Sequence, residues 1–301
     1  MRAPSAFSPT ARSSNDRLRV TPHSAAVGLR NSLRLVSSAA VAASRSSLCR
    51  PPRIYLLLTM LPRSVLDAAL HGDVNTVIDW LDERAADANI VNARCTECAG
   101  MTLLIGSAVG GQKDLVACLL QRQADIDVRD AEGHSALMAA TEHGQTAVVA
   151  ALLKSGASTE LRDETDGETA LMTACSSGHS AIVHMLLRAG AKIDARDEDG
   201  ASALELAARR GHAAVLKLLC KGLSSGQDGV AVAVRALILS AQQGHTKAIE
   251  ALLLGTGLRG DACDSQGLTA LQAARIAGHP ACVELLEQSL CETVRSAECS
   301  C

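Results

Sequence analysis

Residues 168–200, "ETALMTACSSGHSAIVHMLLRAGAKIDARDEDG", read as one complete structural unit. Thr169 predicts a helix start, because its hydroxyl at an N-cap can accept a hydrogen bond from an unpaired amide of the first turn. Small and apolar residues then follow at helical spacing on one face, namely Leu171, Ala174 and Cys175. Gly178 ends this helix, since glycine tolerates the positive φ of a tight turn.

A second helix and an extended turn complete the unit. The residues with the spacing of a half-buried helix are Ile182, Val183, Leu186 and Leu187. Gly190 stops this helix in the usual left-handed C-terminal position. Residues 191–200 then supply two short extended arms around an Asp-x-x-Gly turn. Such a unit cannot bury its apolar face alone, so it must stack on copies of itself.

Copies of this unit occur along most of the chain. Glycines equivalent to Gly178 stand at Gly72, Gly111, Gly144, Gly211, Gly244 and Gly278. The gaps between successive glycines are 39, 33, 34, 33, 33 and 34 residues, so only the first departs from the period. A regular period of a turn and two helices predicts a solenoid in which each repeat contacts only its neighbours.

The chain resembles the ankyrin-repeat family over roughly residues 61–290, because period, caps, breakers and apolar stripe agree in seven units. The resemblance implies an all-α fold, a solenoid of about seven helix-turn-helix repeats with short β-hairpin fingers and fourteen antiparallel helices. Where the family has the histidine of its Thr-Pro-Leu-His motif, this chain has Met138, Met172, Glu205, Ile238 and Gln272, and Ala, Leu or Val replaces the proline. We therefore expect local hydrogen bonding, but not the fold, to differ from the family pattern.

Residues 1–60 differ in composition from the rest of the chain. They contain nine Arg, no Lys and a single acid, Asp16, so they carry +8, and the remainder carries −11. This composition is typical of a mitochondrial or plastid transit peptide, while a true start at Met60 or a plain disordered tail are the alternatives. We divide the chain into a disordered or targeting segment (1–60), an ankyrin-repeat domain (61–290) and a Cys-containing C-terminal tail (291–301).

Two repeats are irregular. Residues 82–100, "DERAADANIVNARCTECAG", make an insertion after the helix predicted over Val74–Leu81. Residues 221–234, "KGLSSGQDGVAVAV", have no counterpart to the extended arms of the other units. We expect the next helix to begin early, in the apolar run Val230–Ser240, and to replace half of the missing hairpin.

The cysteines bear on chemistry and on compartment. Cys95 and Cys98 form a Cys-x-x-Cys in the insertion, but no second ligand pair lies near in sequence, so a metal or redox role is the minor alternative. A prenylation motif fails at Cys299 and Cys301, because Glu298 is the fourth residue from the end. Eleven cysteines without a secretory signal indicate a reducing compartment, so we expect the cytoplasm, or the mitochondrion or plastid if a transit peptide is present.

Known catalytic signatures are missing from the sequence. It has no nucleophile elbow, HExxH or kinase motif, and residues 222–229 lack the Gly-Lys-Ser/Thr of a phosphate loop. We therefore expect that the protein is not an enzyme and binds no cofactor. The negative repeat body and three aromatic residues argue against nucleic acid. Four histidines recur after the inter-helix glycine and are interpreted as structural: His179, His212, His245 and His279.

The favoured function is a non-enzymatic protein-binding scaffold or adaptor, since stacked repeats create an extended concave surface. We expect it to be monomeric outside its complex. The alternative is a regulatory or substrate-recruiting subunit of a larger enzyme complex. The resemblance implies that partners meet the finger tips and the exposed side of the first helices. The tip residues are Asp130, Glu132, His134, Glu164, Asp166, Glu168, Asp197, Glu198 and Asp199. The helix residues are Glu142, His143, Ser176, Ser177, Arg209, Arg210, Gln242, Gln243 and Arg275.

The acidic fingers have two interpretations. Acids in such turns serve turn geometry and solubility, which needs no partner. The sharper hypothesis is that the fingers attract a Lys- or Arg-rich peptide whose own acidic group reaches Arg209 or Arg210.

Overall fold

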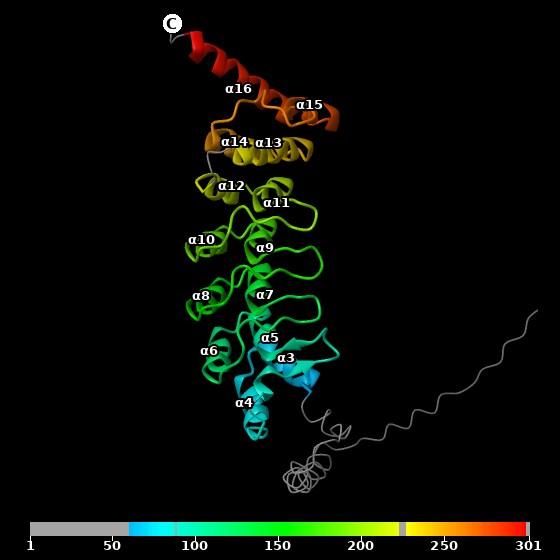
Figure 1. Ribbon diagram of the computed structural model, residues 1–301, viewed down its shortest axis with the longest axis vertical. Helices are drawn as coiled ribbons and strands as arrows, with labels where there is room; N and C mark the ends of the chain where they lie inside the picture. The colour runs from blue at the N-terminus through cyan, green and yellow to red at the C-terminus, as the bar shows by residue number, and fades with distance from the viewer. Residues whose placement is uncertain (1–59, 88, 223–226, 299–301) are drawn as a thin grey trace, which may run out of the picture. The chain divides into compact units, whose positions relative to one another are not determined.

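The computed structural model describes residues 60–87, 89–222 and 227–298. These residues form fourteen α-helices stacked in antiparallel pairs, as expected for an all-α solenoid (Figure 1). The first helices of the pairs are α3 (Arg63–His71), α5 (Leu103–Val109), α7 (Ala136–Glu142), α9 (Ala170–Ser177), α11 (Ala203–Arg210), α13 (Gln227–Gln242) and α15 (Ala270–Ala277). The second helices are α4 (Val74–Asp82), α6 (Lys113–Gln121), α8 (Thr146–Lys154), α10 (Ser180–Arg188), α12 (Ala213–Cys220), α14 (Thr246–Thr256) and α16 (Pro280–Glu298).

The central repeat has the predicted pattern of burial and breaks. The apolar stripe of α9 is buried at Leu171, Ala174 and Cys175. Helix α9 ends at Gly178, whose φ of 78° is left-handed, and Gly190 after α10 has a φ of 90°. Both glycines therefore occupy backbone conformations that other residues adopt only with strain.

The predicted cap at Thr169 is wrong in one respect. Thr169 has the backbone of an N-cap, with φ −93° and ψ 164°, but its hydroxyl makes no capping hydrogen bond. Ser202 has nearly the same backbone (φ −95°, ψ 164°) and does cap α11. The same backbone thus does not bring the Thr169 hydroxyl to a cap, and this buried hydroxyl has no partner in the described part of the chain.

One leucine per repeat lies at the same buried position of the first helix. Each of these side chains is at most 2% exposed: Leu66, Leu104, Leu137, Leu171, Leu204 and Leu237. The equivalent Leu271 in α15 is only half-buried, because the stack ends there. These leucines and the alanines beside them join all pairs into one continuous core.

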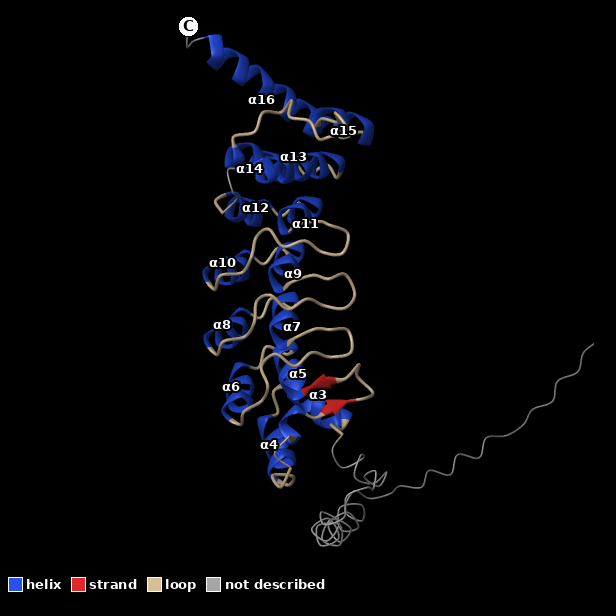
Figure 2. Ribbon diagram, in the orientation of Figure 1, coloured by secondary structure: helices blue, strands red, loops and turns tan. Residues whose placement is uncertain are grey.

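Short fingers connect the pairs on one side of the stack (Figure 2). The insertion of the first repeat forms a 3-10 turn, η1 (Ile90–Asn92), and a hairpin of β1 (Arg94–Cys95) and β2 (Met101–Thr102), with Arg94 opposite Thr102. In later fingers the hairpin is reduced to single bridges, Arg129–Ser135, Arg162–Thr169, Arg196–Ser202 and Cys263–Thr269. We call the four consecutive fingers 94–102, 129–135, 162–169 and 196–202 the finger row.

The finger row is interrupted before α13. This helix begins early, as expected. Helix α13 has 16 residues and begins at Gln227, whereas α11 has 8. The predicted loss of the finger also covered residues 223–226, which lie outside the described residues, as do Cys299 and Cys301. At the other end, α16 continues to Glu298, past the predicted boundary at residue 290. No helix of the described ranges is long and apolar enough to span a membrane.

Candidate protein-binding face

In the fingers 129–135, 162–169 and 196–202, the turn is built around one aspartate. Asp163 Oδ1 accepts hydrogen bonds from the amides of Asp166 and Gly167, both at 2.9 Å. Asp130 Oδ1 accepts from Glu132 N (3.0 Å) and His134 N (2.9 Å). Asp130 was expected to face a partner, but it is only 8% exposed, because its carboxylate is turned into its own turn. Asp197 has the same role through the Ala201 amide at 2.6 Å.

Backbone hydrogen bonds tie each finger of the row to the next. The pairs are Ala131 N to Ala99 O (2.7 Å), Glu164 N to Glu132 O (2.9 Å) and Glu198 N to Asp166 O (2.8 Å). Each donor and acceptor belongs to the same turn position in successive repeats. The tips are therefore held at a fixed spacing before any partner arrives, which lowers the entropic cost of binding.

A series of arginines adds a second set of links. Arg129 Nη1 donates to the Arg162 carbonyl at 2.9 Å, and Arg162 Nη1 donates to the Arg196 carbonyl at 2.5 Å. Sequence reasoning missed these residues. Their signal was present, because an Arg-Asp dipeptide recurs at 129, 162 and 196 with the repeat period.

The exposed acids of the row lie on consecutive tips. Glu132, Asp166, Glu198 and Asp199 are exposed, while Glu168 is half-buried. The pKa of Glu168 is raised, first by burial and then by the charges of Asp163, Asp166 and Asp197. Glu168 thus lies near three other acids of its own finger and the next.

Two of the predicted tip residues already have charged neighbours. Glu164 Oε1 lies 3.1 Å from Arg129 Nη2 of the preceding finger. His134 Nδ1 lies 3.6 Å from Glu132 Oε2 and 3.9 Å from Asp130 Oδ2. A protonated His134 would therefore reduce the charge of the first acidic tip.

The predicted helix residues lie at the C-terminal ends of the first helices, whereas the fingers join these helices at their N-terminal ends. Arg209 and Arg210 occupy the last turn of α11 and are exposed. Gln242 and Gln243 at the end of α13, and Glu142 and His143 at the end of α7, are exposed too. Because the finger enters α11 at its first residue, the arginines lie about 10 Å along the helix axis from the finger base. The structure therefore does not bring the arginines and the acidic tips together. Arg275 is engaged already, since its Nη2 lies 2.6 Å from Glu287 Oε1 of α16.

The recurring histidines link successive first helices. In each, Nε2 donates to a carbonyl near the end of the preceding first helix: His179 to Glu142 (3.2 Å), His212 to Ser176 (2.9 Å), His245 to Arg209 (3.2 Å) and His279 to Gln242 (3.0 Å). Gln112 and Gln145 make the same contact in the earlier repeats, to Leu70 (3.2 Å) and Val109 (3.1 Å). The structural interpretation of these histidines is confirmed.

A buried carboxylate replaces the family's histidine at Glu205. Its Oε2 accepts hydrogen bonds from Ser202 N (2.7 Å) and Ser202 Oγ (2.8 Å), which completes a capping box at the start of α11. Its Oε1 lies 2.9 Å from Arg235 Nε of α13, and Oε2 lies 3.9 Å from Arg196 Nη1. The Arg235 contact is an ion pair without hydrogen-bond alignment, so Oε1 makes no regular hydrogen bond. The Ser-x-x-Glu spacing was the sequence signal for this cap.

The Cys-x-x-Cys pair lies in the first finger. Cys95 is buried on β1, and Cys98 is half-buried in the turn. The pKa of Cys98 is raised, first by burial and then by its interaction with Cys95. A raised pKa disfavours the thiolate that redox exchange and metal binding both need. In the described ranges, no three His, Cys, Asp or Glu side chains gather closely enough to hold a metal ion.

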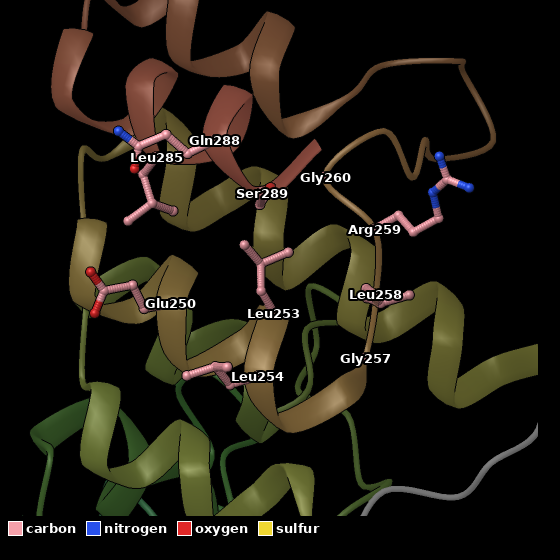
Figure 3. Close-up of a pocket in the computed structure, with 10 residues that line it drawn as sticks. All are labelled: Glu250, Leu253, Leu254, Gly257, Leu258, Arg259, Gly260, Leu285, Gln288 and Ser289. Atoms are coloured by element: carbon pink, nitrogen blue, oxygen red, sulfur yellow. The ribbon is translucent and has the colours of Figure 1, made fainter. Parts of the chain in front are cut away.

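The structure also shows a hollow outside the predicted face. A pocket of about 600 Å³ lies between α14 and α16 (Figure 3). Its lining is mixed, with Leu253, Leu258 and Leu285 beside Glu250 and Arg259. Leu254 at its edge is 83% exposed, which is unusual for a leucine of this repeat domain.

Comparison with known proteins places the repeats. A family model described as "Ankyrin repeats (3 copies)" matches residues 65–163 and 155–231. "Ankyrin repeat and SAM domain-containing protein 6" of Rattus norvegicus is 36% identical over 99 residues, which cover 33% of this chain and 11% of that protein. The Mus musculus protein of the same name is 38% identical over 92 residues, 30% of this chain and 10% of that protein. The chain thus spans about a tenth of the length of these curated relatives.

A solved structure agrees with the fold. The human ASB11 ankyrin repeat domain superposes with a TM-score of 0.62 at 20% identity. The match covers 76% of this chain and 98% of that chain.

Proposed function

This chain belongs to the ankyrin-repeat family, and from that premise we propose that it is a non-enzymatic scaffold or adaptor whose protein partner binds the finger row. Ankyrin repeats are in general modules for protein–protein interaction. The observation that carries the proposal is the line of exposed acids on consecutive tips, whose spacing is fixed by backbone bonds from finger to finger. The alternative, a recruiting subunit of a larger enzyme complex, uses the same face. The cysteine content favours the cytoplasm or another reducing compartment.

The charges of the face define the partner. A Lys- or Arg-rich segment would be attracted to Glu132, Asp166, Glu198 and Asp199 together. The pKa of Glu168 is raised first by burial and then by repulsion from nearby acids, and a bound cation would relieve the second of these. To place its own acid on Arg209 or Arg210 as well, an extended segment must span more than about 10 Å, or at least roughly three residues, because the acidic tips lie beyond the finger base. This sets a minimum separation between the basic and acidic groups of the partner.

The test removes the acids and keeps the fold. After the partner is captured with the full chain, Asp166, Glu168, Glu198 and Asp199 are replaced by Ser and the association rate is measured at about 0.02 M and about 0.2 M salt. We expect slower association and a weaker salt dependence, because Coulomb steering acts on the encounter.

A matched variant controls for total charge. Asp79, Asp114, Glu250 and Glu284 are exposed acids on the second helices, away from the fingers. Their replacement by Ser removes the same charge and should leave the association rate nearly unchanged. Equal effects of the two quadruple variants would show that the finger acids shape turns and serve solubility only.

A further inference from the structure

The interruption of the finger row leaves unpaired backbone groups at a fixed register. In the row, the accepting carbonyls belong to Ala99, Glu132 and Asp166. The next carbonyl at the repeat spacing is that of Asp199, and it accepts no hydrogen bond from any described residue. The corresponding donor in the next finger, beyond the interruption, is the amide of Ser265, which likewise has no acceptor among the described residues. The two groups border the interruption from both sides.

The arginine series stops at the same place. Arg129 and Arg162 each reach the carbonyl of the following finger. Arg196 reaches no following finger in the described ranges: its Nη1 donates to the Gly200 carbonyl of its own finger at 2.8 Å and lies 3.9 Å from Glu205 Oε2. Its side chain is 44% exposed, so its remaining donors are open to solvent. A carbonyl at the position of the missing finger would complete the series.

A small hollow lies beside these groups. It has a volume of about 200 Å³, and its apolar lining is Ile193, Leu204 and Val232, with Asp194, Arg196 and Asp228 as its charged residues. Val232, in α13, closes it from the side of the next repeat. The link of residues 221–226 is less than half as long as the equivalent link of residues 189–202, so this chain has too few residues here for a finger of its own.

We propose that this interruption is a docking site for an extended arm of a partner protein, which replaces the missing finger in trans. The arm donates one backbone N–H to the Asp199 carbonyl, and one of its backbone carbonyls accepts from Arg196. A valine- or leucine-sized side chain enters the hollow beside Leu204. This is strand addition to an open edge, with backbone bonds for affinity and one side-chain pocket for selectivity. It rests on the protein-binding role proposed above, but uses other atoms than the acidic side chains.

The test uses a finger of this chain as the probe. A fluorescein-labelled peptide of residues 191–202, "AKIDARDEDGAS", is titrated with the full chain and followed by fluorescence anisotropy. In the row, the amide of Glu198 and the carbonyl of Arg196 make the contacts with the preceding finger. We expect saturable binding, weakened about tenfold when the Glu198 amide of the peptide is N-methylated, which removes one donor without changing the protein.

Two variants of the chain locate the peptide. Arg196→Gln should weaken binding about tenfold, whereas Arg162→Gln, at the same position of a finger that has its neighbour, should not. No saturation up to about 1 mM, equal binding of the N-methylated peptide, or equal effects of the two variants would overturn the proposal. Dimerisation of the chain that Arg196→Gln abolishes would also overturn it, in favour of a second copy. The quadruple acid variant keeps the Asp199 carbonyl and should still bind the peptide, so failure of the proposed function would remain distinguishable.

Discussion

Replacement of Glu205 by Ala should destabilise the repeat domain more than its size suggests. The change removes the acceptor of the buried Ser202 amide, which costs about 1–3 kcal/mol when no other partner replaces it. The ion pair with Arg235 adds at most about 1 kcal/mol, because that side chain is 52% exposed. Relief of the buried carboxylate's desolvation offsets part of this. We therefore expect a loss of about 2–3 kcal/mol, or about 4–12 °C in Tm for a domain of this size.

Two comparison variants separate the causes. Glu205→Gln keeps an oxygen for the Ser202 amide and loses only the ion pair, so it should cost about 1 kcal/mol or less. Gln272→Ala removes the same kind of capping box at Thr269, where the side chain is exposed and water can replace it, and should also cost less than about 1 kcal/mol. Thermal and urea unfolding by circular dichroism measures all three. If Glu205→Ala and Gln272→Ala shift the midpoint equally, burial of the cap contributes nothing and the reasoning fails.

Three further changes test the core, the acidic face and the histidine links. Leu171→Asp should lower stability by several kcal/mol, on the order of 4, since it buries an unpaired charge in the centre of the stack; unchanged thermal unfolding would contradict this. Glu168→Gln should raise Tm at pH 7, because the raised pKa of Glu168 means that its ionisation disfavours the folded state. The gain in Tm should vanish as pH falls below that pKa, and a gain that persists in acid would refute this cause. His212→Ala should lower stability by about 1 kcal/mol, while His212→Gln should retain it by copying the contact of Gln145; equal loss in both would exclude the side-chain link.

Local signals in the sequence predicted the helices well. The glycine at Gly178, the apolar stripe of α9 and the apolar run that starts α13 early each act within a few residues, so they can be read from a short window. The period then placed the repeats. The resemblance to ankyrin proteins identified the family and predicted the antiparallel helix pairs.

Features that depend on a neighbour one repeat away were not predicted. The Arg129 and Arg162 links and the burial of Asp130 need the position of the next finger or the direction of a carboxylate. The missing cap at Thr169 occurs on a backbone like that of the capping Ser202, so a pattern that predicts the backbone does not predict this hydrogen bond. For the binding face, most of the predicted residues are exposed, but Asp130 is buried and Glu168 is half-buried. The sequence also did not show that Arg209 and Arg210 lie at the far end of α11 from the acidic tips.

The break in the finger row has a mechanical consequence. At the three joints within the finger row, separation of the first helices must break finger bonds on one side as well as helix packing. Between α11 and α13 the arginine and amide links of the fingers are missing, because they end at Arg196 and Asp199. Helix packing, the Glu205–Arg235 contact and the hydrogen bonds of His245 and Ser240 to the end of α11 remain. The stack should therefore bend more easily at this joint than at any joint within the row. Tension along the stack would open the finger side there first, and a partner bound across the joint would act as a brace.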